Sequence, residues 1–270
     1  MTGGVDSRAL SSRIRAHALR MVHGAKSSHI GTCLSMADLL AVLYAEVLNV
    51  RPTDPTWSER DRLILSKGHG AAILYAVLAE RGFFPLSWLE LFAADGSALT
   101  GHVSHHVPGI ELSTGSLGHG LSVGTGLALA ARRSGAQWRT VVLCSDGELD
   151  EGSNWEPILF APHHRLGGLT LIVDYNKIQS FGTVEEVLPL EPLADKFRAF
   201  RWDVVEIDGH DHDAVGAALR DVSADVPRCI LAHTIKGRGV DFMEGKLAWH
   251  YKSPSDDELA DALAQVCAMT

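Results

Sequence analysis

Apolar residues follow two different spacings along this chain. Helical spacing covers Asp6 to Lys26, and a second helix is expected from Ser35, a candidate N-cap, to Val47. Short apolar runs of strand length lie between helix-like stretches, near residues 63–66, 141–144, 169–173, 203–207 and 228–232. Strands that alternate with helices in this way predict an α/β fold, a mostly parallel sheet with helices on both faces.

The composition fits one large domain. The chain has 270 residues, of which 46% are hydrophobic and 21% are charged, which is enough to bury a full core. No internal repeat, low-complexity run or linker divides it, so residues 1–270 are expected to form a single domain. The net charge of −9 argues against non-specific binding to nucleic acid.

Cysteine usage and hydropathy indicate the compartment. The four cysteines show neither metal-ligand nor disulfide spacing, which is simplest in a reducing environment. They are Cys33, Cys144, Cys229 and Cys267. No apolar run is long enough to cross a membrane, and the N-terminus lacks the apolar region of a secretory signal. We therefore expect a cytoplasmic protein without a membrane partner.

Two of the expected strands end in polar residues that suit a metal ion. The run that ends at Leu143 leads to Asp146-Gly147, and the run that ends at Val173 leads to Asn176. Asp146 and Asn176 are about 30 positions apart, the length of one strand–helix–strand unit, so they are expected side by side at the carboxyl ends of neighbouring strands. A carboxylate and an amide oxygen suit a hard divalent cation that carries a phosphorylated ligand. An Asp-Gly turn and a loop asparagine also occur in α/β proteins without this role.

Other motifs are spread over the rest of the chain, most of them rich in histidine or glycine. In order, they are Ser28-His29-Ile30-Gly31, Leu65-Ser66-Lys67-Gly68-His69 with Leu74-Tyr75, Gly101-His102, Thr114-Gly115-Ser116-Leu117-Gly118-His119-Gly120, Ile207-Asp208-Gly209-His210-Asp211, Lys236-Gly237-Arg238-Gly239-Val240, Met243-Glu244 and Trp249-His250. Together with the Asp146/Asn176 pair, these motifs resemble, in the same order, those of the thiamine diphosphate-binding N-terminal part of transketolase. The resemblance covers nearly the whole chain and implies a thiamine diphosphate-binding fold.

The resemblance also implies an activity and a partner. Transketolases move a two-carbon ketol unit from a ketose donor, usually phosphorylated, to an aldose acceptor. In this family a second domain binds the aminopyrimidine ring of the cofactor and a third domain follows, and neither is found here after the helix-like Ser255 to Val266. The chain is therefore similar to the N-terminal subunit of a split transketolase, inactive until it joins a C-terminal subunit in an α2β2 heterotetramer.

Site residues are implied where the motifs match. Asp146, Asn176 and the main-chain carbonyl of Ile178 would hold Mg²⁺, for which Ca²⁺ or Mn²⁺ substitutes. Catalytic histidines are implied near the diphosphate and the reacting carbon (His69, His250) and along the channel to the thiazolium (His29, His102). Histidine suits this work because its unperturbed pKa lies close to neutral pH. The implied cofactor contacts are His69, Gly115, Ser116, Leu117, Asp146, Gly147, Glu148, Asn176, Ile178 and His250.

Other histidines match no motif and are expected to be structural or at the surface. They are His17, His23, His163, His164, His212 and His233. The segment His102-Val103-Ser104-His105-His106 leaves a zinc site as an alternative, since three imidazoles lie close in sequence but no fourth ligand stands nearby.

A few positions depart from the family pattern or leave two interpretations. Val103 stands where the family usually has proline, and Ser145 where it usually has glycine. His119 stands where many transketolases have glutamine. Glu151 either lies at a subunit interface, as in the relatives, or only favours the N-terminus of the following helix.

Two other functions remain open at this stage. One is an α-type subunit of a thiamine diphosphate-dependent 2-oxoacid dehydrogenase or decarboxylase, which shares the diphosphate domain. The other is a non-catalytic subunit that binds cofactor or supports assembly. A dinucleotide site is disfavoured, because no Gly-x-Gly-x-x-Gly follows the first expected strand. The sequence leaves the donor, the acceptor and the pathway open.

Overall fold

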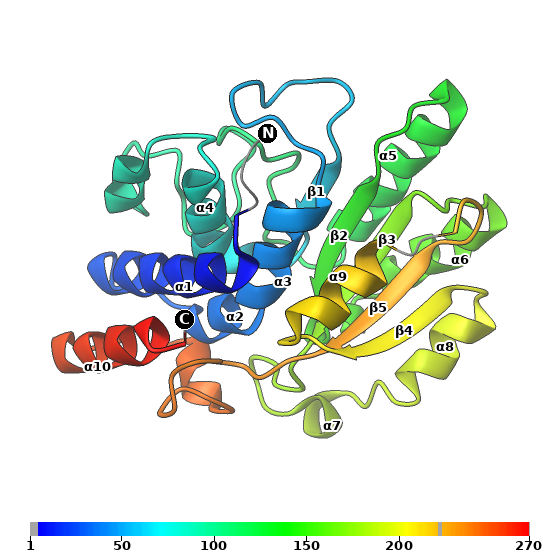
Figure 1. Ribbon diagram of the computed structural model, residues 1–270. Helices are drawn as coiled ribbons and strands as arrows, with labels where there is room; N and C mark the ends of the chain where they lie inside the picture. The colour runs from blue at the N-terminus through cyan, green and yellow to red at the C-terminus, as the bar shows by residue number, and fades with distance from the viewer. Residues whose placement is uncertain (1–4, 221–222, 270) are drawn as a thin grey trace.

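A five-stranded parallel sheet forms the centre of the computed structural model, which describes residues 5–220 and 223–269. Its order is β1-β2-β3-β5-β4, and every neighbouring pair is parallel (Figure 1). The strands are β1 (Arg62–Leu65), β2 (Thr140–Ser145), β3 (Leu169–Tyr175), β4 (Asp203–Asp208) and β5 (Arg228–His233). All five expected strands are present within a residue or two of their expected positions, which confirms the predicted fold class.

Successive strand side chains enter two separate hydrophobic cores. In β1, Leu63 and Leu65 join one cluster while Ile64 joins the other, as the two-residue period of a strand requires. Helices cover both faces for this reason (Figure 1). The first core is shared with α1 (Ser7–Gly24), α3 (Ala37–Val42), α4 (Ala71–Glu80) and α9 (His212–Arg220). The second is shared with α5 (Gly120–Ser134), α6 (Trp155–His163) and α8 (Leu193–Ala199).

The prediction of one helix from Ser35 to Val47 is wrong in two respects: helix α3 (Ala37–Val42) begins after Ser35, and the chain does not continue as an α-helix to Val47. Helix α2 (Ile30–Ser35) precedes α3, and a π-helical turn, η1 (Leu43–Val47), follows it. Ser35 ends α2 and is not the N-cap of α3: its hydroxyl donates to Asp174 Oδ2 at 2.5 Å and lies 3.0 Å from the carbonyl oxygen of Thr32. A partner 139 residues away therefore overrides the local capping preference of this serine.

Short elements complete the chain. Helices α7 (Val184–Val187) and α10 (Asp256–Cys267) each begin with a capping box, formed by Thr183 with Glu186 and by Ser255 with Glu258. Short 3-10 helices are η2 (Gly68–Gly70), η3 (Leu86–Leu91), η4 (Gly147–Asp150), η5 (Gly152–Asn154) and η6 (Leu247–His250). Within the described ranges, no helix combines the length and apolarity that a membrane span requires.

Candidate active site

A cavity of about 200 Å³ lies at the carboxyl ends of the central strands. Parallel strands place the loops that follow them at one edge of the sheet, which is where open α/β sheets bind ligands. Loops after β1, β2, β3 and β5 all reach this cavity, together with the start of α2. The lining residues are His29, Thr32, His69, His102, Gly115, Leu117, Ser145, Asp146, Gly147, Asn176, Ile178, Gln179, Ser180, Lys236 and His250.

Asp146 and Asn176 lie side by side, as their spacing predicts. Strands β2 and β3 pair in register up to Ser145 opposite Asp174, so both loops leave the sheet together. Asp146 accepts hydrogen bonds from the Gly147 amide at 2.7 Å and from the Lys177 amide at 2.5 Å. Lys177 has a φ of 65°, in the left-handed region, which turns the chain sharply between Asn176 and Ile178.

These residues fit a divalent cation. The Asp146 carboxylate, the Asn176 amide oxygen and the Ile178 carbonyl offer three hard oxygen donors at one wall of the cavity. Burial, followed by the negative charge of Asp174, raises the pKa of Asp146 to about 6. A buried acid held in this way is stabilised in its charged form by a nearby cation. The donor set therefore suits the Mg²⁺ that the family resemblance implies.

A buried ion pair supports this wall from beneath. Lys67, in the loop after β1, binds Asp174 at the end of β3, and both side chains are fully buried. Asp174 also accepts from Ser35, Thr234 and the Asn176 side-chain amide. The last contact, at 3.4 Å, orients Asn176 so that its amide nitrogen faces Asp174. Its side-chain oxygen accepts from the Ile178 amide at 3.1 Å and keeps a second lone pair for another partner.

Four histidines from distant parts of the chain meet at the cavity. The ring centroid of His29 lies 5.2 Å from that of His69, 5.9 Å from His102 and 5.1 Å from His250, and His69 lies 5.8 Å from His250. His29 adopts a left-handed φ of 75° before α2, and its amide donates to the His250 carbonyl at 2.9 Å. Strained backbone of this kind is concentrated at functional sites.

Burial controls the charge of three of these imidazoles, His29, His69 and His250. It is the main cause that lowers the pKa of His29 to about 4 and that of His250 to about 3, and it holds the pKa of His69 well below its usual value. Neighbouring positive charges, chiefly Lys236 for His250, lower these values further. At neutral pH the three rings are therefore uncharged. In His250 the acceptor nitrogen is Nδ1, which faces the Lys236 ammonium, so Nε2 carries the hydrogen and can donate it.

Lys236 is the cationic residue that joins the wall of oxygen donors to the histidines. Its Nζ donates to the Ile178 carbonyl at 2.9 Å and lies 3.1 Å from His250 Nδ1. Burial, and then the positive charge of Lys67, lower the pKa of Lys236 to about 8. A cation here faces the place where an anionic ligand would bind beside Asp146 and Asn176.

Two expected cofactor contacts lie away from the cavity lining. Gly115 and Leu117 line the cavity, whereas Ser116 and Glu148 do not. Glu148 is fully buried, and its carboxylate accepts hydrogen bonds from Ser66 and from the Gly118 amide at 2.9 Å. Gly118 has a φ of 85°, a left-handed conformation that favours glycine. Glu148 thus anchors the loop that presents Gly115 and Leu117.

The segment from His102 to His106 divides its imidazoles between two places. His102 faces the ring of His29, whereas His105 Nδ1 bonds Ser113 Oγ at 2.7 Å and stacks on His106. Across the part of the chain that the structure describes, no group of three or more His, Cys, Asp or Glu side chains is arranged to hold a metal ion. The zinc alternative therefore has no support in this arrangement. Val103 is buried, and its amide donates to the Gly68 carbonyl at 3.1 Å.

The sequence interpretation assigned no role to several residues at the site. Lys236, Thr32, Gln179 and Ser180 line the cavity, and Lys67 with Asp174 lies directly beneath it. The sequence does mark three of these residues. Lys67 and Lys236 each lie inside a motif, and Asp174 is a carboxylate at the end of an apolar strand. For Thr32 and Ser180 no local pattern marks the position.

Comparisons with known proteins agree with this geometry. A family model described as "Transketolase, thiamine diphosphate binding domain" matches residues 6–267. The chain is 39% identical over 258 residues to a subunit of the apulose-4-phosphate transketolase of Phocaeicola vulgatus, covering 95% of this chain and 92% of that protein. It is also 40% identical over 265 residues to the 6-deoxy-6-sulfo-D-fructose transketolase subunit SqwG of a Clostridium species. This match covers 97% of this chain and 96% of that protein.

Solved structures give the same result for the fold. The transketolase of Leishmania mexicana aligns with a TM-score of 0.90 at 32% identity over 98% of this chain, and that of Campylobacter jejuni with a TM-score of 0.90 at 30% identity over 97%. The chain spans 42% of the length of each. The expected family is confirmed, and the 2-oxoacid dehydrogenase alternative gains no support. This chain belongs to the transketolase family of enzymes and carries its thiamine diphosphate binding domain.

Proposed function

We propose that this chain is the diphosphate-binding subunit of a transketolase that moves a two-carbon ketol unit from a ketose to an aldose. The observation that carries the proposal is the joining of two features in one cavity. Oxygen donors from Asp146, Asn176 and Ile178 form one wall, and the imidazoles of His29, His69, His102 and His250 form another. Chemistry on a phosphorylated cofactor and proton exchange with sugar hydroxyls need these two features together.

In this proposal the metal wall holds the diphosphate. Asp146, Asn176 and the Ile178 carbonyl would hold Mg²⁺, with Ca²⁺ or Mn²⁺ as substitutes, and this cation would supply the positive charge that a bound diphosphate needs. Gly115 and Leu117 contact the cofactor through the main chain. When bound, thiamine diphosphate supplies an electron-accepting ring for carbanion chemistry.

The histidines hold and move protons. Neutral imidazoles at His69 and His250 accept a proton from a sugar hydroxyl or donate a hydrogen bond to it, as ketol transfer requires at donor and acceptor in turn. His29 and His102 line the approach and orient the hydroxyls. Lys236 keeps positive charge beside the diphosphate while its contact fixes the ring of His250.

The proposed substrates are ketoses that carry an anionic group, with a phosphorylated ketose as the main candidate. The relatives named above are described as acting on apulose 4-phosphate and on 6-deoxy-6-sulfo-D-fructose, one a phosphate ester and the other a sulfonate. Both names indicate sugars outside the common pentose phosphates. A panel of anionic ketoses is therefore the appropriate substrate screen.

A second polypeptide completes the proposed enzyme. The names of the relatives as subunits support a separate chain with the pyrimidine-binding and C-terminal domains. Val123, Leu159 and Phe160 are exposed on α5 and α6, beside a hollow of about 290 Å³, and such apolar surface marks an interface. We place this face and Glu151 in the contacts of a cytoplasmic α2β2 heterotetramer, in which residues 1–270 act as one domain.

Reconstitution tests the proposal. The chain is co-expressed with the product of the neighbouring reading frame, and the complex is assayed for ketol transfer with thiamine diphosphate and Mg²⁺. Activity of the complex and none of the purified chain is expected. Stable ketol transfer by the chain alone, or a complex inactive on every anionic ketose tested, would overturn it.

Calorimetry tests the metal wall separately. Asp146→Ala should abolish thiamine diphosphate binding because it removes the only carboxylate of the donor set, whereas the surface variant Asp213→Ala should bind like the unmodified complex. Chelation with EDTA should have the same effect as Asp146→Ala. Equal affinity with and without the chelator would contradict a metal-dependent site.

A further inference from the structure

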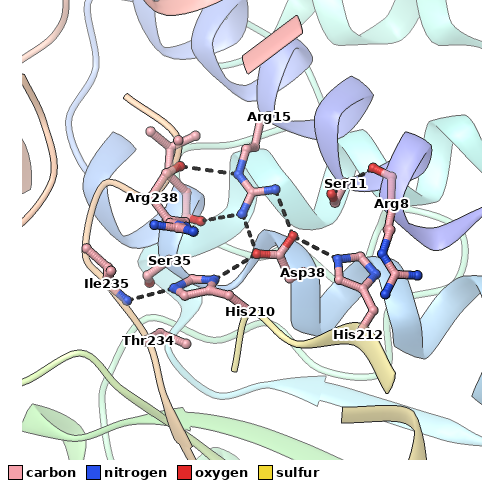
Figure 2. A network of polar contacts seen from close by, with 12 residues as sticks. Arg8, Ser11, Arg15, Ser35, Asp38, His210, His212, Thr234, Ile235 and Arg238 are labelled. Atoms are coloured by element: carbon pink, nitrogen blue, oxygen red, sulfur yellow. Dashed lines mark hydrogen bonds and ion pairs between the residues drawn. The ribbon is translucent and has the colours of Figure 1, made fainter. Parts of the chain in front are cut away.

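A second cluster of buried polar groups lies between α1, α3 and the loop after β4 (Figure 2). Asp38 is at its centre and is only 4% exposed. Arg15, fully buried, binds both oxygens of this carboxylate, at 2.9 Å and 2.6 Å. His210 Nδ1 lies 2.7 Å from Oδ2 and His212 Nε2 lies 3.1 Å from Oδ1. Burial acts to raise the pKa of Asp38, but the charge of Arg15 and the two imidazole contacts outweigh it, and the pKa is held well below its usual range.

The two histidines differ in what their second nitrogen contacts. The amide of Ile235 donates to His210 Nε2 at 2.9 Å, so this nitrogen is the acceptor and Nδ1 carries the proton toward Asp38 (Figure 2). His212 Nδ1 contacts the Ser7 hydroxyl at 2.9 Å. Of the two, His210 alone therefore connects Asp38 to the segment that follows β5.

That segment carries Lys236 into the cavity. The amides on either side of Ile235 and Lys236 have main-chain partners: Thr234 donates to the Tyr175 carbonyl at 3.3 Å and Gly237 to the Gly31 carbonyl at 2.9 Å. The Ile235 amide lies past the end of the β5 ladder and is held by the His210 side chain instead. The next residue is Lys236, whose Nζ reaches the Ile178 carbonyl and His250 Nδ1.

Close packing fixes the distance between the loop and the segment. Gly209 donates its amide to the His233 carbonyl at 2.8 Å, and a Cβ added at Gly209 would lie 2.5 Å from Thr234 Cγ2. Only glycine allows the loop to lie this close, which brings His210 within reach of Ile235. Arg15 holds the other end of the segment through the Arg238 carbonyl at 3.3 Å.

We propose that His210 is a positioning residue for the active site: oriented by Asp38, it holds the Ile235 amide and so sets the place of the Lys236 ammonium group against Ile178 and His250. The inference rests on the proposed function for its effect on catalysis. The inference goes beyond the proposed function because it gives a role to the segment Asp208-Gly209-His210-Asp211, none of whose residues lines the cavity.

Hydrogen exchange on the purified chain is the first test, and it requires no activity. His210→Ala should speed exchange of the Ile235 amide about tenfold, since one hydrogen bond is lost. His210→Gln, whose side-chain oxygen replaces Nε2 as an acceptor, should restore most of the protection. His212→Ala is the matched control: it removes a contact to the same Asp38 and should leave Ile235 unchanged. Equal acceleration in the His210 and His212 variants would overturn the inference, as would no acceleration in either.

A double-variant cycle in the reconstituted complex is the second test. His210→Ala should lower kcat about tenfold, His210→Gln should recover most of that loss, and His212→Ala should stay within about twofold of the unmodified complex. In a Lys236→Met background the penalty of His210→Ala should disappear, because the group that it positions is absent. An undiminished penalty in that background would show that His210 acts in another way.

The two tests separate this inference from the proposed function. A complex without ketol transfer on any ketose would contradict the proposed function, and the exchange of Ile235 would still confirm or overturn the role of His210. Normal ketol transfer combined with unchanged exchange in His210→Ala would overturn the positioning role alone. If His210→Ala does not fold, His210→Phe, which fills the same space but has no acceptor nitrogen, takes its place. Exchange of the Ile235 amide that is faster in His210→Phe than in His210→Gln supports the role, and equal exchange in these two variants contradicts it.

Discussion

Two groups of histidines in this protein have opposite surroundings. In the described part of the chain, His29, His69, His102 and His250 share a cavity and make no hydrogen bond to a carboxylate. His210 and His212 share Asp38, and each has a second partner for its other nitrogen. The first group lies in the cavity at the carboxyl ends of β1, β2, β3 and β5, and the second follows the carboxyl end of the edge strand β4, where α1 and α3 pack.

The difference shows how one side chain serves two purposes. An imidazole that is buried without an acid partner has a lowered pKa and stays neutral with a free nitrogen, which suits proton exchange. An imidazole with both nitrogens bonded has no free position and acts as a fixed connector. The type of partner, more than burial, therefore separates the candidate catalytic histidines from the structural ones.

The largest effect is expected on turnover when a cavity histidine is removed. In the reconstituted complex, His69→Ala and His250→Ala should each lower kcat by about 10²–10⁴, the range for loss of a general acid–base group. His163→Ala, in α6 and outside the cavity, should leave kcat unchanged and serves as the control. Loss of equal size in a folded His163 variant would remove the distinction between the two groups.

The next effect concerns stability and belongs to the Asp38 group. Asp38→Ala leaves the guanidinium of Arg15 buried without a counter-charge and should lower the free energy of unfolding by about 3–5 kcal/mol. Urea denaturation measures this, and His250→Ala is the comparison, expected to change the unfolding midpoint far less. A similar loss in both variants would show that the cavity histidines also act as structural connectors.

The two groups should also differ in the pH range over which they affect stability. The pKa of His29 falls from 6.5 to about 4 on folding, so the unfolded chain binds a proton that the folded chain does not. The contribution of neutral His29 to the free energy of unfolding is therefore complete above pH 6.5 and is lost as the pH falls toward 4. Asp38, with a depressed pKa, loses its contribution only below the usual range of a carboxyl group.

Urea midpoints between about pH 7.5 and 5, which include the upper part of that window, test this difference. His29→Gln should make the midpoint less dependent on pH, because Gln cannot take up a proton. Asp38→Asn should lower the midpoint by a similar amount at both ends of this range. An unchanged pH dependence in His29→Gln would contradict the neutral state assigned to that ring.

The smallest effect is expected at the edge of the Asp38 group. Ser7→Ala removes the hydroxyl that contacts His212 Nδ1 and should cost about 1 kcal/mol of unfolding free energy. Because the Ser7 hydroxyl contacts His212 and not His210, thiamine diphosphate affinity in the complex should stay the same. A weaker affinity in Ser7→Ala would mean that the whole cluster, and not His210 alone, supports the site.

Much of the framework follows from local sequence patterns. Strand runs with two-residue alternation predict which side chains enter each core, and the polar residues that end them predict the edge where ligands bind. Asp146 and Asn176 were placed side by side for this reason, and the register of β2 and β3 shows them so. The histidine motifs identify the residues of the cavity, but their catalytic roles remain predictions.

The amino-acid sequence by itself determined the α/β fold, the positions of its strands and the neighbourhood of Asp146 and Asn176, because each depends on side chains close together in the chain. The other candidate site residues followed from the resemblance of the motifs to those of a known family. Only the tertiary structure decided which polar groups, distant in sequence, form hydrogen bonds with one another. Ser35 bonds Asp174 instead of capping a helix, Lys236 reaches the Ile178 carbonyl from 58 residues away, and Asp38 lies 172 residues from His210. Buried polar groups must find partners wherever packing supplies them, and no local periodicity records that choice.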